Sequence, residues 1–500
     1  MSNKEHIRLI AVDIGTTNVK AALYRQESGI DRQEIESCST SYPRLGYVEQ
    51  DPDEVVAAVV RAIRHLVENT CIPPQEIDAI VFDGIWQSLV AVNHDGMALI
   101  PASLWADTRS IQQNELLKEY LDTEEIKERT GCSLHPMYFL SRLAWIRKEM
   151  PELYSRADRF VSLKEYVIQH LFGVCKVDRS IASGTGIWNM STLNWDAELL
   201  SQVGLTEDRF SECVEPTYIL PGLKKGSALS LGLLEGTPGI IGAADGAMSH
   251  LGSIGLAETK MSLTVGTGAA LRMLRKSPQI MPGTEAWCYY LAEGNWLLGG
   301  VLNDAGNALR WFADTLMPAG GENKDDVFSQ MNSLAAEVPL GANGLCFIPF
   351  LGGERCPHYR PQAKGALYGL TFSHTRAHLI RALMEGLAYN LYSVYRMLVQ
   401  DSDPDLVVTG GILKSPIWLQ IVSDFFGKSL WLPRISEAAI WGDVLLGLRA
   451  LNIIESLEET TALVDFAGKQ NPNQTHSIKY QELYSIYEQL YSDLYDSNQR

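Results

Sequence analysis

Two apolar segments, far apart in the chain, each run into a tight turn and continue as a second apolar segment. The first covers residues 9–24 and turns at Gly15-Thr16-Thr17. The second covers residues 261–272 and turns at Gly266-Thr267-Gly268. Short apolar runs on either side of a glycine-containing turn predict a β-hairpin. We therefore expect two hairpins in separate parts of the chain.

The chemistry of these turns indicates an anionic ligand. Glycine lets the backbone approach a ligand closely, and successive turn N–H groups form an anion-binding concavity. The threonines at positions 16, 17 and 267 add hydroxyl donors without adding charge. Two such turns in separate halves predict two domains that grip one polyphosphate between them. The alternative, two unrelated hairpins, stays open on the turns alone.

The remaining pattern is that of an α/β protein. Residues 77–82 and 88–92 read as strands. Helical spacing predicts a long helix with its apolar face at Leu379, Leu383, Leu387, Leu391, Val394 and Leu398. A second helical stripe, predicted to be a docking face, consists of Tyr480, Tyr484, Tyr487, Tyr491 and Leu494. The turn at residues 235–238 precedes a predicted strand at 239–244, and we divide the chain there into domains 1–240 and 241–500.

Composition narrows the class of protein. A chain of 500 residues exceeds one hydrophobic core, so more than one domain is expected. The net charge of −18 argues against nucleic-acid binding. No apolar run is long enough to span a membrane, and residues 1–6 lead into a strand without resembling a signal peptide. The 8 cysteines include no Cys-x-x-Cys pair, which is typical of reduced thiols in a cytoplasmic protein.

Two other phosphate-binding motifs fail on inspection. Gly427-Lys428-Ser429 resembles the end of a P-loop, but Val422 stands where the first glycine is required. No Gly-x-Gly-x-x-Gly lies between a strand and a helix, as a dinucleotide-binding fold requires. The two hairpin turns remain the phosphate-binding prediction.

Two longer motifs carry a family resemblance. Residues 137–149 resemble the first signature of the FGGY carbohydrate kinases, with departures at Phe139 and Arg142. Residues 365–385 match the second signature, including Gly369-Leu370 and Leu383-Met384-Glu385. The resemblance covers nearly the whole chain. It implies an α/β fold of two actin-like (ribonuclease-H-like) domains around a central ATP cleft.

The resemblance assigns the catalytic chemistry to Asp245, which ends an apolar segment and precedes a predicted helix. A sugar hydroxyl is a poor nucleophile, and a carboxylate within hydrogen-bond reach accepts its proton during phosphoryl transfer. The alternative is that Asp245 only caps a helix. The resemblance also implies that Asp13 orients hydrated Mg²⁺ at the phosphates, with Asp245 contributing through water. The alternative is that Asp13 only stabilises the turn.

The same resemblance implies an adenosine site at residues 407–418. A strand there runs into Gly410 and Gly411, after which Ser415 and Pro416 read as the N-cap and first residue of a helix. A plain loop-to-helix joint fits these residues equally well. Gly306 and Asn307 are expected to border the nucleotide too.

The acceptor is the harder prediction. Trp105 lies in a segment similar to one that lines the sugar site of this family. Four further stretches are most similar to gluconokinases: 129–131, 135–137, 183–186, and Gly299-Gly300 with Asn307 and Arg310-Trp311. Trp86-Gln87 stands where many members carry Met-His, so we expect both in the sugar pocket, with simple packing at a strand end as the alternative. Gluconate is the first expected substrate and a ketose such as xylulose, or a polyol, the second. A sugar-independent actin-like ATPase is a third reading, and a homodimer is left open.

Overall fold

Two β-sheets form the two halves of the molecule in this computed structural model, which describes residues 6–317, 324–400 and 402–496. The six-stranded N-terminal sheet has the order β13-β14-β5-β1-β2-β3. Its strands are β1 (Arg8–Ile14), β2 (Asn18–Arg25), β3 (Gly29–Ser37), β5 (Ala79–Gly84), β13 (Ile219–Gly222) and β14 (Pro238–Ile240). The expectation that residues 1–6 do not resemble a signal peptide concerns residues 1–5, which lie outside the described residues.

The seven-stranded C-terminal sheet has the order β17-β18-β16-β15-β21-β22-β23. Its strands are β15 (Lys260–Val265), β16 (Ala269–Arg275), β17 (Trp287–Ala292), β18 (Asn295–Leu302), β21 (Asp405–Gly410), β22 (Leu430–Pro433) and β23 (Phe466–Gln470). Because β14 pairs with β5, the N-terminal sheet extends to residue 240. The domain division at that residue stays a prediction.

Both predicted hairpins are present, and they occupy equivalent positions. β1 pairs antiparallel with β2 and parallel with β5, while β15 pairs antiparallel with β16 and parallel with β21. The turn N–H of Gly15 donates to Asn18 O at 3.1 Å, and that of Gly266 donates to Gly268 O at 2.9 Å. Each turn therefore lies beside the carboxyl end of a parallel neighbour, the usual ligand-binding edge of an α/β sheet.

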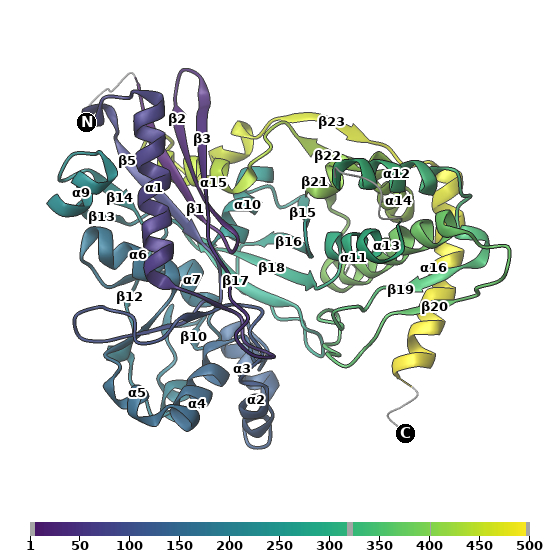
Figure 1. Ribbon diagram of the computed structural model, residues 1–500, viewed down its shortest axis with the longest axis horizontal. Helices are drawn as coiled ribbons and strands as arrows, with labels where there is room; N and C mark the ends of the chain where they lie inside the picture. The colour runs from purple at the N-terminus through teal and green to yellow at the C-terminus, as the bar shows by residue number, and fades with distance from the viewer. Residues whose placement is uncertain (1–5, 318–323, 401, 497–500) are drawn as a thin grey trace.

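Two helices fill the space between the sheets: α10 (Asp245–Ile254) and α15 (Ala438–Ala450) (Figure 1). They cross closely, because a Cβ on Gly252 would lie 1.8 Å from Ala438 O and one on Gly442 would lie 2.1 Å from Met248 O. Ile440 and Val444 of α15 share a buried core with Leu9 and Val81 of the N-terminal sheet. The C-terminal half thus supplies a helix to the core of the N-terminal half.

The outer helices follow the apolar periodicity. The N-terminal sheet is covered by α1 (Pro52–Thr70) and α6 (Leu163–Phe172), and the other large helices are α4 (Phe139–Glu149), α11 (Gly306–Leu316), α12 (Lys324–Ala336), α13 (Arg376–Val399), α14 (Pro416–Phe426) and α16 (Gln474–Tyr495). The helix predicted over 379–398 is α13. The tyrosine stripe is a docking face, as predicted, since Tyr480, Tyr484 and Tyr487 are buried beside Tyr389.

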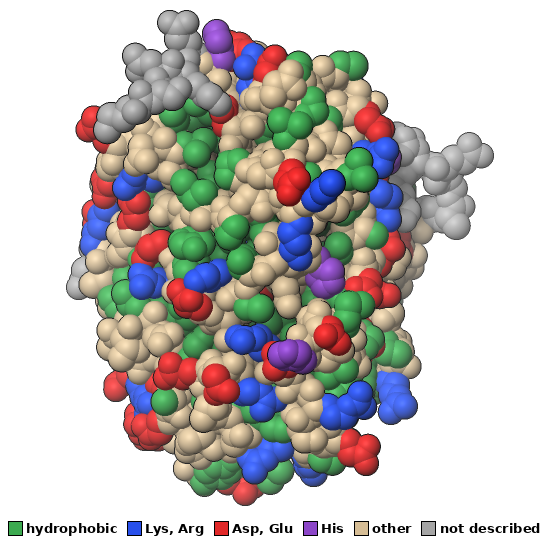
Figure 2. Space-filling model, turned by 90° about the vertical axis from the view of Figure 1, so that its left-hand side faces the viewer, with side chains coloured by type: hydrophobic (Ala, Val, Ile, Leu, Met, Phe, Trp, Pro, Cys, Tyr) green, Lys and Arg blue, Asp and Glu red, His purple; other side chains and the backbone are tan. Residues whose placement is uncertain are grey.

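Charges of both signs are interspersed over the face of the molecule that Figure 2 shows, and Lys and Arg do not gather there into one continuous patch. Among the described residues, no helix combines the length and the apolar character that crossing a membrane requires. All 8 cysteines are free thiols, and Cys71 is exposed while Cys132, Cys288 and Cys356 are buried.

Candidate active site

Asp245 is the first residue of α10, one of the two helices that lie between the sheets (Figure 1). The predicted strand over 239–244 is shorter in the structure, ending at Ile240, so an extended segment carries the chain into the helix. The Asp245 Oδ1 atom accepts a 2.6 Å hydrogen bond from the N–H of Gly246. Burial, and then the negative charge of Asp13, raise the pKa of Asp245 to about 6. A carboxylate of that basicity accepts a proton near neutral pH more readily than an ordinary aspartate.

Asp13 lies at the carboxyl end of β1, in register with Asp83 of β5. Its carboxylate is 3.7 Å from Nζ of Lys20, which in turn lies 2.7 Å from Glu437 beside α15. Burial raises the pKa of Asp13, and the charge of Lys20 offsets part of that rise. Asp83 and Asp443 are fully buried next to it, and burial followed by the charge of Asp13 raises the pKa of both well above the ordinary value.

Arg272 is a half-buried cation close to Asp245, and we did not predict it. It projects from β16, and its Nη2 would lie 2.9 Å from a Cβ added to Gly246. Burial lowers the pKa of this guanidinium to about 10, while the nearby Asp245 carboxylate opposes that shift. Its position beside Asp245 follows from the packing of α10 on the sheet that contains β15 and β16, a contact between elements that residue spacing in the sequence does not reveal.

The C-terminal turn is joined to the start of α11. Gly306 N–H donates to Gly266 O at 2.9 Å, and Asn307 N–H donates to Thr267 O at 3.0 Å. A Cβ on Gly266 would meet no atom within 4 Å, so this turn faces open space. The turn and the helix start therefore form one wall of a cavity.

That cavity, of about 800 Å³, gathers six of the residues predicted for nucleotide binding: Gly266, Thr267, Gly306, Asn307, Gly411 and Ser415. Ser415 is the N-cap of α14, as predicted, and its hydroxyl donates to Asn332 Oδ1 at 2.6 Å. Gly268 and Gly410 adjoin the cavity in sequence, while Asp13, Gly15, Thr16 and Thr17 come from the N-terminal hairpin and are not among the residues that line it.

Several residues of the cavity were missed. Phe328 and Asn332 come from α12, and Met384 and Trp418 from α13 and α14. Arg310 lies over Phe328 at 6.0 Å from the ring centroid. No sequence motif marks α12 as part of the cavity. It lines the cavity only because of where this amphipathic helix packs in the fold.

Trp86 and Gln87 belong to an aromatic cluster that both halves of the chain build. The ring centroid of Trp86 lies 5.0 Å from that of Tyr289 and 5.6 Å from that of Trp287, and both of these residues lie on β17. The Gln87 Nε2 group donates to Gly184 O at 3.1 Å and to the Tyr289 hydroxyl at 3.2 Å. Tyr138 and Tyr289 share a 2.7 Å hydroxyl contact. Both donor hydrogens of Gln87 are thus engaged within the protein.

This aromatic cluster reaches Asp245. A Cβ on Gly246 would lie 2.4 Å from Cζ3 of Trp86, so the indole covers the first turn of α10. Trp105 differs: it lies beyond β7 (Ala102–Ser103), 41% exposed, and it makes no ring contact with this cluster in the part of the chain that the structure describes. Tyr138, at the start of α4, and Trp287 and Tyr289, on β17, were missed because they come from different halves of the chain.

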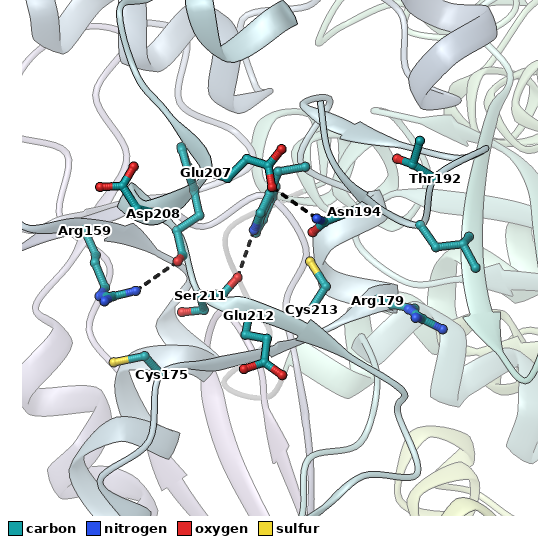
Figure 3. Close-up of a pocket in the computed structure, with 13 residues that line it drawn as sticks. Arg159, Cys175, Arg179, Thr192, Asn194, Glu207, Asp208, Ser211, Glu212 and Cys213 are labelled. Atoms are coloured by element: carbon teal, nitrogen blue, oxygen red, sulfur yellow. Dashed lines mark hydrogen bonds between the residues drawn. The ribbon is translucent and has the colours of Figure 1, made fainter. Parts of the chain in front are cut away.

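A second hollow, of about 680 Å³, opens on the N-terminal half and contains none of the predicted residues (Figure 3). Its arginines already have partners: Arg159 donates to Phe210 O at 3.0 Å, and Arg179 pairs with Glu215. The candidate site therefore consists of the nucleotide cavity and the aromatic cluster, together with Asp245 at the start of α10.

Comparison with known proteins agrees with this architecture. Residues 8–252 match the N-terminal domain, and residues 261–451 the C-terminal domain, of the FGGY family of carbohydrate kinases. Gluconokinase of Bacillus subtilis (strain 168) is 33% identical over 486 residues, which cover 96% of this chain and 94% of the relative. Xylulose kinase of the same organism is 28% identical over 494 residues, 98% of each chain.

Solved structures give the same result. The gluconate kinase from Lactobacillus acidophilus superposes with a TM-score of 0.92 at 28% identity, covering 98% of both chains. A ligand-bound xylulose kinase from that organism also gives 0.92 at 28% identity, covering 97% of this chain and 98% of the other. The expected two-domain kinase fold is confirmed. The chain belongs to the FGGY family of carbohydrate kinases and phosphorylates a sugar-type substrate with ATP as donor.

Proposed function

We propose that the enzyme transfers the γ-phosphoryl group of ATP to the primary alcohol of gluconate, giving 6-phosphogluconate and ADP. The observation that carries the proposal is Asp245, a carboxylate of raised pKa at the start of α10, flanked by Asp13 of the first hairpin and Arg272 of the second. Gluconate is preferred because gluconokinases share 32–33% identity with 96% of this chain.

In the proposed step, Asp245 accepts the proton of the sugar hydroxyl as its oxygen bonds to the γ-phosphorus. The bond from that phosphorus to the β–γ bridging oxygen breaks, and ADP leaves. Arg272 and the turn N–H groups of Thr16, Thr17, Thr267 and Gly268 offer donors for the charge on the phosphoryl oxygens, because those of Gly15 and Gly266 already close their own turns. Positioned donors of this kind supply most of the catalysis in phosphoryl transfer.

Mg²⁺ fits the charge of this site. Asp13, Asp83, Asp245 and Asp443 place several carboxyls together, and burial raises their pKa values, with the charge of Asp13 adding to the rise at the other three. Among the described residues, no three such side chains are arranged to ligate an ion directly, which favours a hydrated ion. Asp13, with Asp245 through water, would hold the hydrated ion, which supplies positive charge at the β- and γ-phosphates. Gly306, Asn307, Gly410, Gly411 and Ser415 would border the adenosine, and Trp86, Gln87 and Trp105 the sugar.

A ketose kinase is the second candidate, because xylulose kinases match almost the whole chain in sequence and in structure. A panel of sugar acids, ketoses and polyols in an ATP-coupled assay separates the two. We expect the highest kcat/KM with gluconate. Turnover of xylulose without turnover of gluconate would overturn the substrate and keep the kinase.

The raised pKa of Asp245 predicts an acid limb in the pH profile. Asp245 must be ionised to accept a proton, so kcat/KM for the sugar should fall below about pH 6, tenfold per pH unit. A profile of kcat/KM from pH 5 to pH 8 measures the pKa in the free enzyme. An inflection near the ordinary value of 3.8, with full activity at pH 5, would contradict this assignment.

A further inference from the structure

In the part of the chain that the structure describes, the Arg355 guanidinium is a strong donor group without an oxygen acceptor. Its Nη2 atom lies 2.8 Å from the thioether sulfur of Met137, a weak acceptor. Among the described residues, no carboxylate comes within ion-pair distance of Arg355. Within the described ranges, the hydrogen-bond partner of this half-buried guanidinium is a sulfur, and the Glu285 carboxylate is influenced by its charge without forming an ion pair, so most of its five N–H donors stay available to an anion.

Arg355 faces the aromatic cluster of the candidate site. After burial, its charge is among the influences on the pKa values of Tyr138 and Tyr289, the two tyrosines that share a hydroxyl contact. Tyr289 also receives the Gln87 amide and packs against Trp86. Arg355 therefore lies beside the pocket predicted for the sugar.

Arg355 contacts Met137, on the Tyr138 side of the aromatic cluster, whereas Asp245 begins α10 on the Trp86 side. The charged groups that most shift the pKa of Asp245 are Asp13, Arg272 and Lys164. Trp86 contacts both the first turn of α10 and Tyr289, Tyr289 contacts Tyr138, and Arg355 contacts the neighbouring Met137, so one continuous wall of side chains runs from the base to Arg355. A linear sugar acid carries its carboxylate and its primary alcohol at opposite ends, which matches this separation.

His135 adds a second donor at the same end. Its Nδ1 accepts a 3.0 Å hydrogen bond from Met137 N–H, which leaves the proton of a neutral ring on Nε2. Burial, and then the charge of Arg355, lower the pKa of His135 well below its usual value. The ring is therefore neutral and still able to donate.

The segment that carries Arg355 is anchored on both sides. Glu354 accepts a 2.6 Å hydrogen bond from Tyr491 of α16, and it exchanges backbone hydrogen bonds with Arg360. Cys356 Sγ donates to Glu285 O at 3.3 Å. A guanidinium on a fixed backbone loses less entropy when it binds a carboxylate.

We propose that Arg355 binds the carboxylate of the sugar acid and so selects acidic over neutral acceptors, with His135 as a second donor. This inference rests on the proposed sugar-acid kinase activity. Bidentate pairing of guanidinium with carboxylate gives both affinity and orientation. The alcohol at the other end of the bound molecule is then directed towards Asp245.

The test uses Arg355→Gln and Arg355→Lys in the full chain, with gluconate and glucitol, which carries a neutral alcohol in place of the carboxylate. Loss of a charged hydrogen bond corresponds to about 10- to 100-fold. In Arg355→Gln we expect KM for gluconate to rise by about that factor. The KM for ATP should not change, and neither should the weak affinity for glucitol, measured by competition. Arg355→Lys keeps the positive charge but loses the two parallel N–H donors of the guanidinium. Its KM for gluconate should therefore lie between those of the wild type and of Arg355→Gln.

Arg360→Gln is the matched control, because it removes a guanidinium from the same segment on the side facing α16, where Arg360 pairs with Asp496. It should leave KM for gluconate unchanged. A normal KM for gluconate in Arg355→Gln would overturn the inference and leave the proposed function intact. If Arg355→Gln does not fold, a normal KM in Arg355→Lys overturns the inference in the same way. A wild-type enzyme that phosphorylates only neutral acceptors would overturn both.

Discussion

Replacing Asp245 by Asn is expected to lower kcat by about two to four orders of magnitude, the usual contribution of a positioned base. The amide keeps the size of the carboxylate but cannot accept the hydroxyl proton. The affinity for ATP should change little, because the residue faces the acceptor. Single-turnover kinetics and calorimetry with ATP measure the two effects separately, and near-normal turnover would remove Asp245 from the proposed role.

The same variant should be more stable than the wild type above pH 6. Burial raises the pKa of Asp245 from 3.8 to about 6, so ionisation disfavours the folded state as the pH rises between these values. The shift corresponds to at most about 3 kcal/mol, less the effect of residual exposure. Asp196→Asn is a useful contrast: it keeps an N-cap oxygen for α8 (Ala197–Gln202) but removes the charged pair with Arg129, so stability should fall while kcat is kept.

Replacing Gly411 by Val is expected to weaken ATP binding at least about tenfold, a loss of roughly 1.4 kcal/mol. Gly411 lines the 800 Å³ cavity, and a Cβ there would meet only Val265 O, at 3.7 Å. The added side chain therefore fits the fold but occupies space proposed for adenosine. Calorimetry with ATP measures the effect, and unchanged affinity would move the adenosine site elsewhere.

The neighbouring glycine could not serve for this test. Gly410 has a φ of +91°, and its Cβ would lie 2.5 Å from Val265 O, so substitution there would strain the backbone itself. Gly468 of β23 is the matched control: a Cβ at that position meets no atom within 4 Å. Gly468→Val should bind ATP as the wild type does.

Local pattern was sufficient for much of this account. The two glycine-threonine hairpins, the long helix α13, the N-cap at Ser415 and the helix that begins at Asp245 follow from apolar periodicity, turn chemistry and capping preferences. These features depend on residues close together in the chain. The extended segment at 241–244 was read as strand because buried apolar residues are alike in both conformations.

Features that depend on contact between the halves were not predictable. Tyr289 stands beside Gln87 only because the C-terminal sheet packs against the N-terminal half. Arg272 stands beside Asp245 through the packing of α10 on the C-terminal sheet, which local pattern does not reveal either. Asp443 enters the carboxyl cluster through α15, a C-terminal helix in the N-terminal core. Arg355 carries no motif for the same reason: its pocket is made by Met137, Tyr138 and Tyr289, which are distant in sequence.

The most direct test of the central claim is to measure ADP, inorganic phosphate and phosphorylated acceptor together, with and without gluconate. The account predicts slow ATP consumption without sugar. With gluconate it predicts strong stimulation, one 6-phosphogluconate formed for each ADP, and no matching release of inorganic phosphate. ADP and inorganic phosphate formed in equal amounts at the same rate, whichever sugar is present, would contradict the claim.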